Sequence, residues 1–121
     1  MGLRTERRDR GDVAVLALHG DLDLNTAPDL RLALMEAIDE RSAKQVVVDL
    51  EGVDFIDSAG LGVLVGGLER ARAAGRELGL VATGRNVLKV LELTGLIRVF
   101  KIHASLAAAL GAARGSGPRS H

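Results

Sequence analysis

Short apolar runs alternate along the chain with longer segments in which apolar residues recur every three or four positions. The short runs are rich in Val and Leu and are bounded by glycine or polar residues, which predicts strands. They lie at residues 13–18, 45–50, 77–82 and 99–103. The longer segments predict helices at 27–40, 58–74 and 87–93, and a short one from 105 to about 113. This order predicts an α/β domain with a central mixed, mostly parallel β-sheet flanked by about four helices.

Two runs carry further information about the sheet. Residues 3–8 are expected to pair with the first strand as an edge hairpin, through the turn Arg10-Gly11-Asp12. The run at 45–50 is almost continuously apolar, which is typical of a strand buried on both faces. On the first helix, the spacing predicts a core-facing side formed by Leu30, Leu34, Ala37 and Ile38.

Hydroxyl and carboxylate side chains mark the starts of two helices. Thr26, followed by Pro28, is predicted to cap the first helix with its hydroxyl. Ser58 follows a strand and precedes an apolar periodic segment, so it is a candidate N-cap whose contribution would be about 1 kcal/mol. Asp57 is expected to stabilise the same helix start through its negative charge.

The second helix is unusually rich in glycine. Gly60, Gly62, Gly66 and Gly67 each cost roughly 0.5 to 1 kcal/mol relative to alanine inside a helix. A helix with only a structural role has no reason to carry that cost. We therefore expect another segment or another protein to approach this backbone closely.

Composition and charge narrow the possible functions. The 121 residues correspond to one domain, predicted at 1–113, with a Gly- and Ser-containing disordered tail at 114–121. Sixteen basic and 16 acidic residues leave no positive excess for nucleic acid or an anionic membrane. The chain has no cysteine, no secretory signal pattern and no long apolar run, so we expect a cytoplasmic protein that is neither exported nor embedded in a membrane.

The candidate functional residues follow two predicted strands. Open α/β sheets place their sites where strands end and helices begin, and the segments 20–27 and 56–62 occupy such positions. Asp21, Asp23 and Asn25 are therefore expected to lie near Asp57 and Ser58. A phosphate on Ser58 would add about −1.5 to −2 charges next to the positive end of a helix. It would leave the helix intact and change what docks there.

Enzymatic chemistry finds little support in the sequence. His19, His103 and His121 lack metal-ligand spacing, and no Gly-x-Ser-x-Gly motif surrounds Ser58. We therefore expect no catalytic residue, no metal and no cofactor in this chain.

Three segments resemble one known family. DFIDSAGLGVLVGG at 54–67, preceded by VVVDLEGV, resembles the phosphorylation-site segment of anti-sigma factor antagonists, which are STAS domains. GDLDLNTAPDL at 20–30 and LELTGL at 91–96 are similar to further segments of that family. The resemblance spans about residues 10–110.

The resemblance implies a partner-switching protein. Unmodified, such a protein binds an anti-sigma factor that is also a serine kinase and so frees the sigma factor; phosphorylation ends the binding, and a serine phosphatase restores it. By position, Ser58 matches the phosphoacceptor, and Ala59 replaces the second hydroxyl residue often found after it. The residues matched to partner binding are Asp21, Asp23, Asn25, Thr26, Asp57, Gly60, Leu61 and Gly62.

Three alternatives use the same residues. A receiver-like domain would phosphorylate Asp49 or Asp57, hold Mg²⁺ with Asp21 and Asp23, and use Lys101. An enzyme similar to haloacid dehalogenase-like phosphatases would use the Asp-x-Asp of segment 21–23 but lacks the later motifs. The third alternative is a STAS scaffold or sensor module without sigma regulation, which has the same sequence features as a partner-switching antagonist. The sequence leaves the oligomeric state open.

Overall fold

A five-stranded sheet forms the centre of the computed structural model, which describes residues 2–40 and 43–115. Its order is β1-β2-β3-β4-β5, with β1 antiparallel to β2 and every other pair parallel. The strands are β1 (Arg4–Arg7), β2 (Val13–Leu22), β3 (Gln45–Ile56), β4 (Glu77–Val81) and β5 (Lys101–His103). The predicted edge hairpin and the mostly parallel sheet are confirmed.

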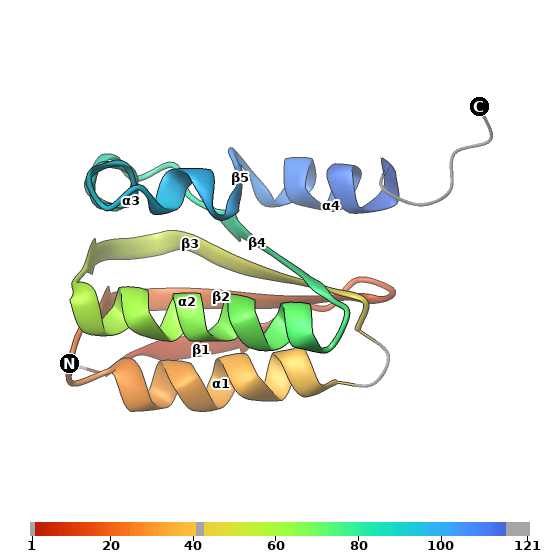
Figure 1. Cartoon of the computed structure of the whole chain (residues 1–121), viewed down its shortest axis with the longest axis horizontal. Helices are drawn as coiled ribbons and strands as arrows, with labels where there is room; N and C mark the ends of the chain where they lie inside the picture. Colours follow the sequence, from red (N-terminus) through yellow and green to blue (C-terminus); the bar gives the residue numbers. More distant parts are fainter. Residues whose placement is uncertain (1, 41–42, 116–121) are drawn as a thin grey trace.

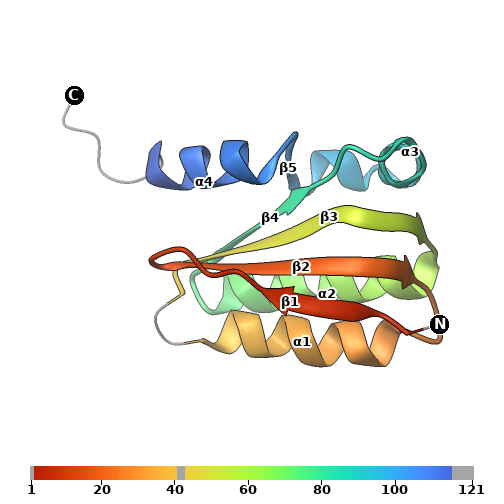
Figure 2. The ribbon, with the colours of Figure 1, turned by 180° about the vertical axis from the view of Figure 1, so that it is seen from behind.

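Helices lie on both sides of this sheet. They are α1 (Ala27–Asp39), α2 (Ser58–Ala73), α3 (Arg85–Leu93) and α4 (Leu106–Gly115). Helices α1 and α2 run side by side along one face (Figure 1), and from behind β1 and β2 lie in front of them (Figure 2). Helices α3 and α4 lie on the side of the sheet away from α1 and α2, at opposite ends of that layer, with β5 between them.

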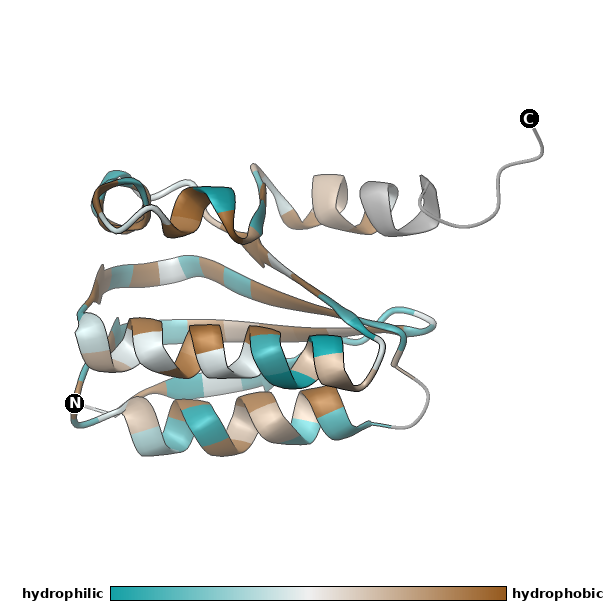
Figure 3. Ribbon diagram, in the orientation of Figure 1, coloured by the Kyte–Doolittle hydropathy of each residue, from teal (hydrophilic) through white to brown (hydrophobic). Residues whose placement is uncertain are grey.

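The core follows from the alternation of side chains along the strands. On β2, Leu16 and Leu18 belong to the large cluster that includes residues of α1 and α2, whereas Val13 and Val15 pack with Ala109 of α4. Long apolar stretches of β2 and β3 are visible in Figure 3. The predicted buried side of α1 is confirmed in full by Leu30, Leu34, Ala37 and Ile38.

Several predicted boundaries were wrong. Strand β3 continues to Ile56, six residues past the apolar run, because pairing with the long β2 carries it on. A 3₁₀ turn at Leu96–Arg98, made possible by the left-handed Gly95 (φ 78°), delays the last strand to Lys101. Helix α4 runs to Gly115, two residues beyond the predicted helix end near 113. The domain bounds 1–113 stay a prediction, and residues 116–121 of the predicted tail lie outside the described residues.

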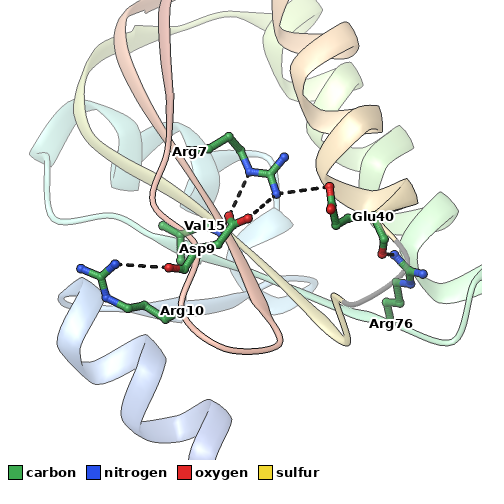
Figure 4. Close-up of polar contacts among 6 residues, drawn as sticks. All are labelled: Arg7, Asp9, Arg10, Val15, Glu40 and Arg76. Atoms are coloured by element: carbon green, nitrogen blue, oxygen red, sulfur yellow. Dashed lines mark hydrogen bonds and ion pairs between the residues drawn. The ribbon is translucent and has the colours of Figure 1, made fainter.

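Ionic contacts tie the hairpin to the end of α1 (Figure 4). Arg7 donates two hydrogen bonds to Asp9, at 3.0 and 2.7 Å, and its guanidinium lies 3.7 Å from Glu40. The hydrogen bond from Arg7 holds the pKa of the Asp9 carboxyl below its ordinary value. Arg76 donates to the backbone oxygens of Ile38 and Glu40. These contacts fix the edge of the sheet where β3 and β4 begin.

Candidate phosphorylation and docking site

The two segments singled out in the sequence meet where β2 and β3 end. Leu22 is the register partner of Ile56, and the backbone N–H of Asp57 donates to the oxygen of Leu22 at 3.0 Å. A Cβ on Gly60 would lie 2.8 Å from both Cβ and O of Leu22, so α2 starts in close contact with the end of β2. The predicted meeting of the segments 20–27 and 56–62 is confirmed.

Asp57, not Ser58, caps helix α2. Asp57 has an extended backbone (φ −111°, ψ −174°), and its Oδ1 accepts hydrogen bonds from the N–H groups of Ala59 (2.9 Å) and Gly60 (3.2 Å). Ser58 is already the first helical residue, so its side chain is not placed to cap the helix. The predicted cap at Ser58 was wrong, and the stabilising role expected for Asp57 is confirmed.

The Ser58 side chain is exposed at this first helical turn. Its hydroxyl makes no hydrogen bond to any other residue that the structure describes. The backbone beneath it is held by the Asp57 cap and by the contact of Gly60 with Leu22. A free hydroxyl therefore stands on a well-supported turn.

The loop between β2 and α1 is closed by its own side chains. Asp23 Oδ1 accepts from the N–H groups of Asn25 (2.9 Å) and Thr26 (3.0 Å). The Thr26 hydroxyl donates to the oxygen of Asp21 (2.8 Å) and accepts from the N–H of Asp23 (3.0 Å). Thr26 occupies the N-cap position, but the prediction that its hydroxyl caps α1 was wrong, because the loop uses that hydroxyl.

Burial divides the residues matched to partner binding. Asp21, Asn25, Ser58 and Gly62 are exposed, and Asp23 and Asp57 are half-buried. Thr26, Gly60 and Leu61 are buried. These three have roles inside the domain: Thr26 closes the loop, Gly60 packs on Leu22, and Leu61 belongs to the core. Partner binding by the matched residues stays a prediction.

The glycines of α2 also fall into two groups, one packed inside the domain and one at an open surface. A Cβ on Gly67 would lie 2.4 Å from Leu34 Cδ2, and one on Gly60 would strike Leu22. The close approach predicted from these two glycines comes from within the molecule. A Cβ on Gly62 or Gly66 would meet nothing within 4 Å, so the helix surface is open there.

Comparison with known proteins agrees with this geometry. The family profile described as STAS domain matches residues 4–109. The chain belongs to the STAS domain family. It is 34% identical over 107 residues to the anti-sigma-F factor antagonist RsfB of Mycobacterium tuberculosis, covering 88% of this chain and 86% of that protein. It is 30% identical over 103 residues to an anti-sigma F factor antagonist of Paenibacillus polymyxa, covering 85% and 88% of the two chains.

A solved structure extends the likeness to the whole fold. The crystal structure of an anti-sigma factor antagonist from Mycobacterium paratuberculosis superimposes with a TM-score of 0.84 at 32% identity, over 93% of this chain and 94% of that one. The family resemblance and the fold class predicted from the sequence are confirmed.

The two segments that meet at this site in the STAS domain are acidic. The segments 20–26 and 51–58 contain no Lys or Arg. Their carboxylates are Asp21, Asp23, Glu51, Asp54 and Asp57. None of the five forms an ion pair with another described residue. Asp23 and Asp57 also accept hydrogen bonds from backbone N–H groups, whereas Asp21, Glu51 and Asp54 are exposed.

Sequence reasoning missed two exposed apolar residues on the segments that meet near Ser58. Leu24, between Asp23 and Asn25, is 75% exposed, and Phe55, three residues before Ser58, is 50% exposed. Both were passed over because apolar residues near strands are usually counted with the core. The signal for Leu24 was its place inside a polar loop.

The geometry of a receiver-like site is not found. Asp49 is buried, and its Oδ1 accepts from the N–H of Glu51 at 2.9 Å. Lys101 pairs with Glu77 at 2.8 Å, where β4 begins rather than where β3 ends. Among the described residues, no group of three or more His, Asp or Glu side chains is placed to hold a metal ion. No described helix is long and apolar enough to cross a membrane.

Proposed function

We propose that this STAS domain is an anti-sigma factor antagonist that acts by partner switching. Unphosphorylated, it binds an anti-sigma factor that is also a serine kinase, and the sigma factor is released. Phosphorylation of Ser58 ends the binding, and a serine phosphatase restores it. The relatives named as anti-sigma factor antagonists in Paenibacillus and Mycobacterium support this proposal.

The exposed, unbonded hydroxyl of Ser58 is the observation that carries the proposal. A kinase must reach the acceptor oxygen, and Ser58 is exposed on a turn already fixed by Asp57. The γ-phosphoryl group of ATP passes to Ser58 Oγ, ADP leaves, and the hydroxyl proton passes to a base of the kinase. This chain is then a substrate and a ligand rather than an enzyme, and it works in the cytoplasm with the transcription machinery.

The phosphate acts on docking rather than on the fold. It adds about −1.5 to −2 charges at the positive end of α2, where helix amides favour an anion. The same charge is added to an edge with five carboxylates and no paired cation among the described residues. A complex that excludes water from Ser58 would have to desolvate that charge, so we expect the partner to leave.

Capture from an extract of the native cells tests the proposal. The unphosphorylated chain is the bait, and mass spectrometry identifies bound proteins and the modified residue after incubation with the captured kinase and ATP. We expect an anti-sigma factor kinase and an acid-stable phosphate on Ser58. An acid-labile, hydroxylamine-sensitive phosphate would instead indicate an aspartyl phosphate, and a partner set without an anti-sigma factor would also contradict the proposal.

A further inference from the structure

Two large apolar side chains stand exposed on the two segments that meet near Ser58. Leu24 is 75% and Phe55 50% exposed. A single exposed apolar residue is ordinary on a protein surface, so what counts is that these two belong to segments that meet in the fold. The remaining large apolar residues with such exposure in the described chain are Leu32, Leu93 and Val99. Leu24 and Phe55 alone among these belong to the two segments that meet at the site.

Their exposure is built into the local structure. Leu24 lies in the loop that Asp23 and Thr26 close with hydrogen bonds, so its position is held from both sides. Phe55 precedes Ile56, which is 3% exposed. Phe55 is held in strand β3 next to Ile56, which is the register partner of Leu22. Neither residue is exposed merely because its segment lacks support.

Charge indicates what would cover them. The segments that carry Leu24 and Phe55 contain five carboxylates and no Lys or Arg. Interfaces commonly join apolar anchors at the centre to complementary charges at the rim. The surface of a partner that fits here is therefore apolar where it meets Leu24 and Phe55, and is bordered by Lys or Arg residues.

We propose that Leu24 and Phe55 are the apolar anchors with which this domain binds its anti-sigma factor kinase, through an apolar surface bordered by basic residues. The inference rests on the proposed function and adds the residues that fix the complex. With one anchor on each of the two segments, water is excluded around Ser58 when the kinase binds. The hydroxyl is thereby delivered to the kinase, and a phosphate left on it must be rehydrated, which separates the two proteins.

Alanine substitutions with a matched control test the anchors. Leu24→Ala and Phe55→Ala are compared with Leu32→Ala, which removes a leucine that is 66% exposed on α1. Binding is measured by calorimetry with the purified kinase obtained from the capture experiment, and phosphorylation of Ser58 by steady-state kinetics. We expect each anchor variant to raise Kd and KM about 10-fold or more, and the control to stay within about 2-fold.

A second measurement covers the case in which Phe55→Ala also weakens the fold. Hydrogen exchange on the unsubstituted complex is expected to slow at residues 23–26 and 54–58 and to stay unchanged on the exposed side of α1. A wild-type Kd for either anchor variant, or unchanged exchange in both segments, overturns the inference while binding and Ser58 phosphorylation of the unsubstituted chain still stand. If the unsubstituted chain neither binds the kinase nor is phosphorylated, the proposed function itself fails.

Discussion

Asp23 and Asp57 make the same pattern of hydrogen bonds to the backbone, but the hydroxyl group near Asp23 is buried and bonded, whereas the one next to Asp57 is exposed and bonded to no other described residue. Asp23 and Asp57 each accept hydrogen bonds from the N–H groups two and three residues ahead. In the first loop the nearby hydroxyl of Thr26 is buried and bonded to the backbone at Asp21 and Asp23. In the second turn the hydroxyl of Ser58 is exposed and free of described partners.

The difference separates a structural hydroxyl from a chemically available one. The Thr26 hydroxyl both donates and accepts a hydrogen bond within the loop, so a substitution of Thr26 should lower the stability of the domain. Ser58 contributes nothing to its own turn, because the Asp57 carboxylate already bonds the helix amides. A modification at Ser58 can then change binding without unfolding the domain, which is what a reversible switch requires.

The largest effect is expected at Ser58 itself. Ser58→Asp should raise the Kd for the anti-sigma factor kinase by about 100-fold, close to 3 kcal/mol, because a charge must be desolvated in the complex. Ser58→Ala should bind like the unsubstituted chain and resist phosphorylation. Calorimetry with the purified kinase measures both, and equal affinities for the Asp and Ala variants would refute the switch.

A smaller effect, on the fold, separates Gly60 from Gly62. Gly60→Leu should lower the free energy of unfolding by about 2 to 3 kcal/mol, because its Cβ meets the backbone of Leu22. Gly62→Leu finds open space and should preserve or slightly raise stability through better helix propensity. We expect Gly62→Leu to weaken kinase binding instead. Urea unfolding and calorimetry together distinguish the two; equal destabilisation would show that Gly62 is also a packing residue.

Thr26 and Ser58 can be compared directly by removing each hydroxyl. Thr26→Val keeps the side-chain shape but removes the hydroxyl partner of two part-buried backbone groups, the N–H of Asp23 and the oxygen of Asp21, so stability should fall by about 1 to 2 kcal/mol. Ser58→Ala should stay within about 0.5 kcal/mol of the original. Urea unfolding gives the free energy of unfolding of both variants, and an unchanged m-value shows that the difference is one of stability. A larger loss for Ser58→Ala would mean that its hydroxyl supports the turn after all.

The smallest expected effect concerns Asp23 and Asp57, the aspartate that closes each of the two turns. Asp57→Ala and Asp23→Ala should each lower stability by about 1 kcal/mol, since each removes the acceptor for two N–H groups. Asp54→Ala is the control, because Asp54 is exposed and accepts no described hydrogen bond. Thermal unfolding gives the differences, and faster amide exchange at Ala59 and Gly60 should accompany Asp57→Ala. A change in Asp54→Ala as large as in the others would point to general electrostatics.

The fold was largely predictable because its main signals are local. Helical spacing identified the buried side of α1 down to Leu34 and Ile38, and a β-branched run marked the buried part of β3. Both follow from the period with which side chains repeat on a helix or strand. Ser58 could also be singled out, because a serine between a strand and a glycine-rich helix is visible without coordinates.

The order of residues along the chain thus determined the elements, their buried faces and the place of Ser58, the proposed phosphorylation site, at the start of α2. Only the tertiary structure decided that Asp57 rather than Ser58 caps α2, that Gly60 and Gly67 serve internal packing, and that Leu24 stays uncovered. The physical reason is that periodicity reports which way a side chain points within its own element. Whether a hydroxyl is bonded, or a missing Cβ leaves room for a neighbour, depends on atoms brought close from another element, such as Leu22 and Leu34.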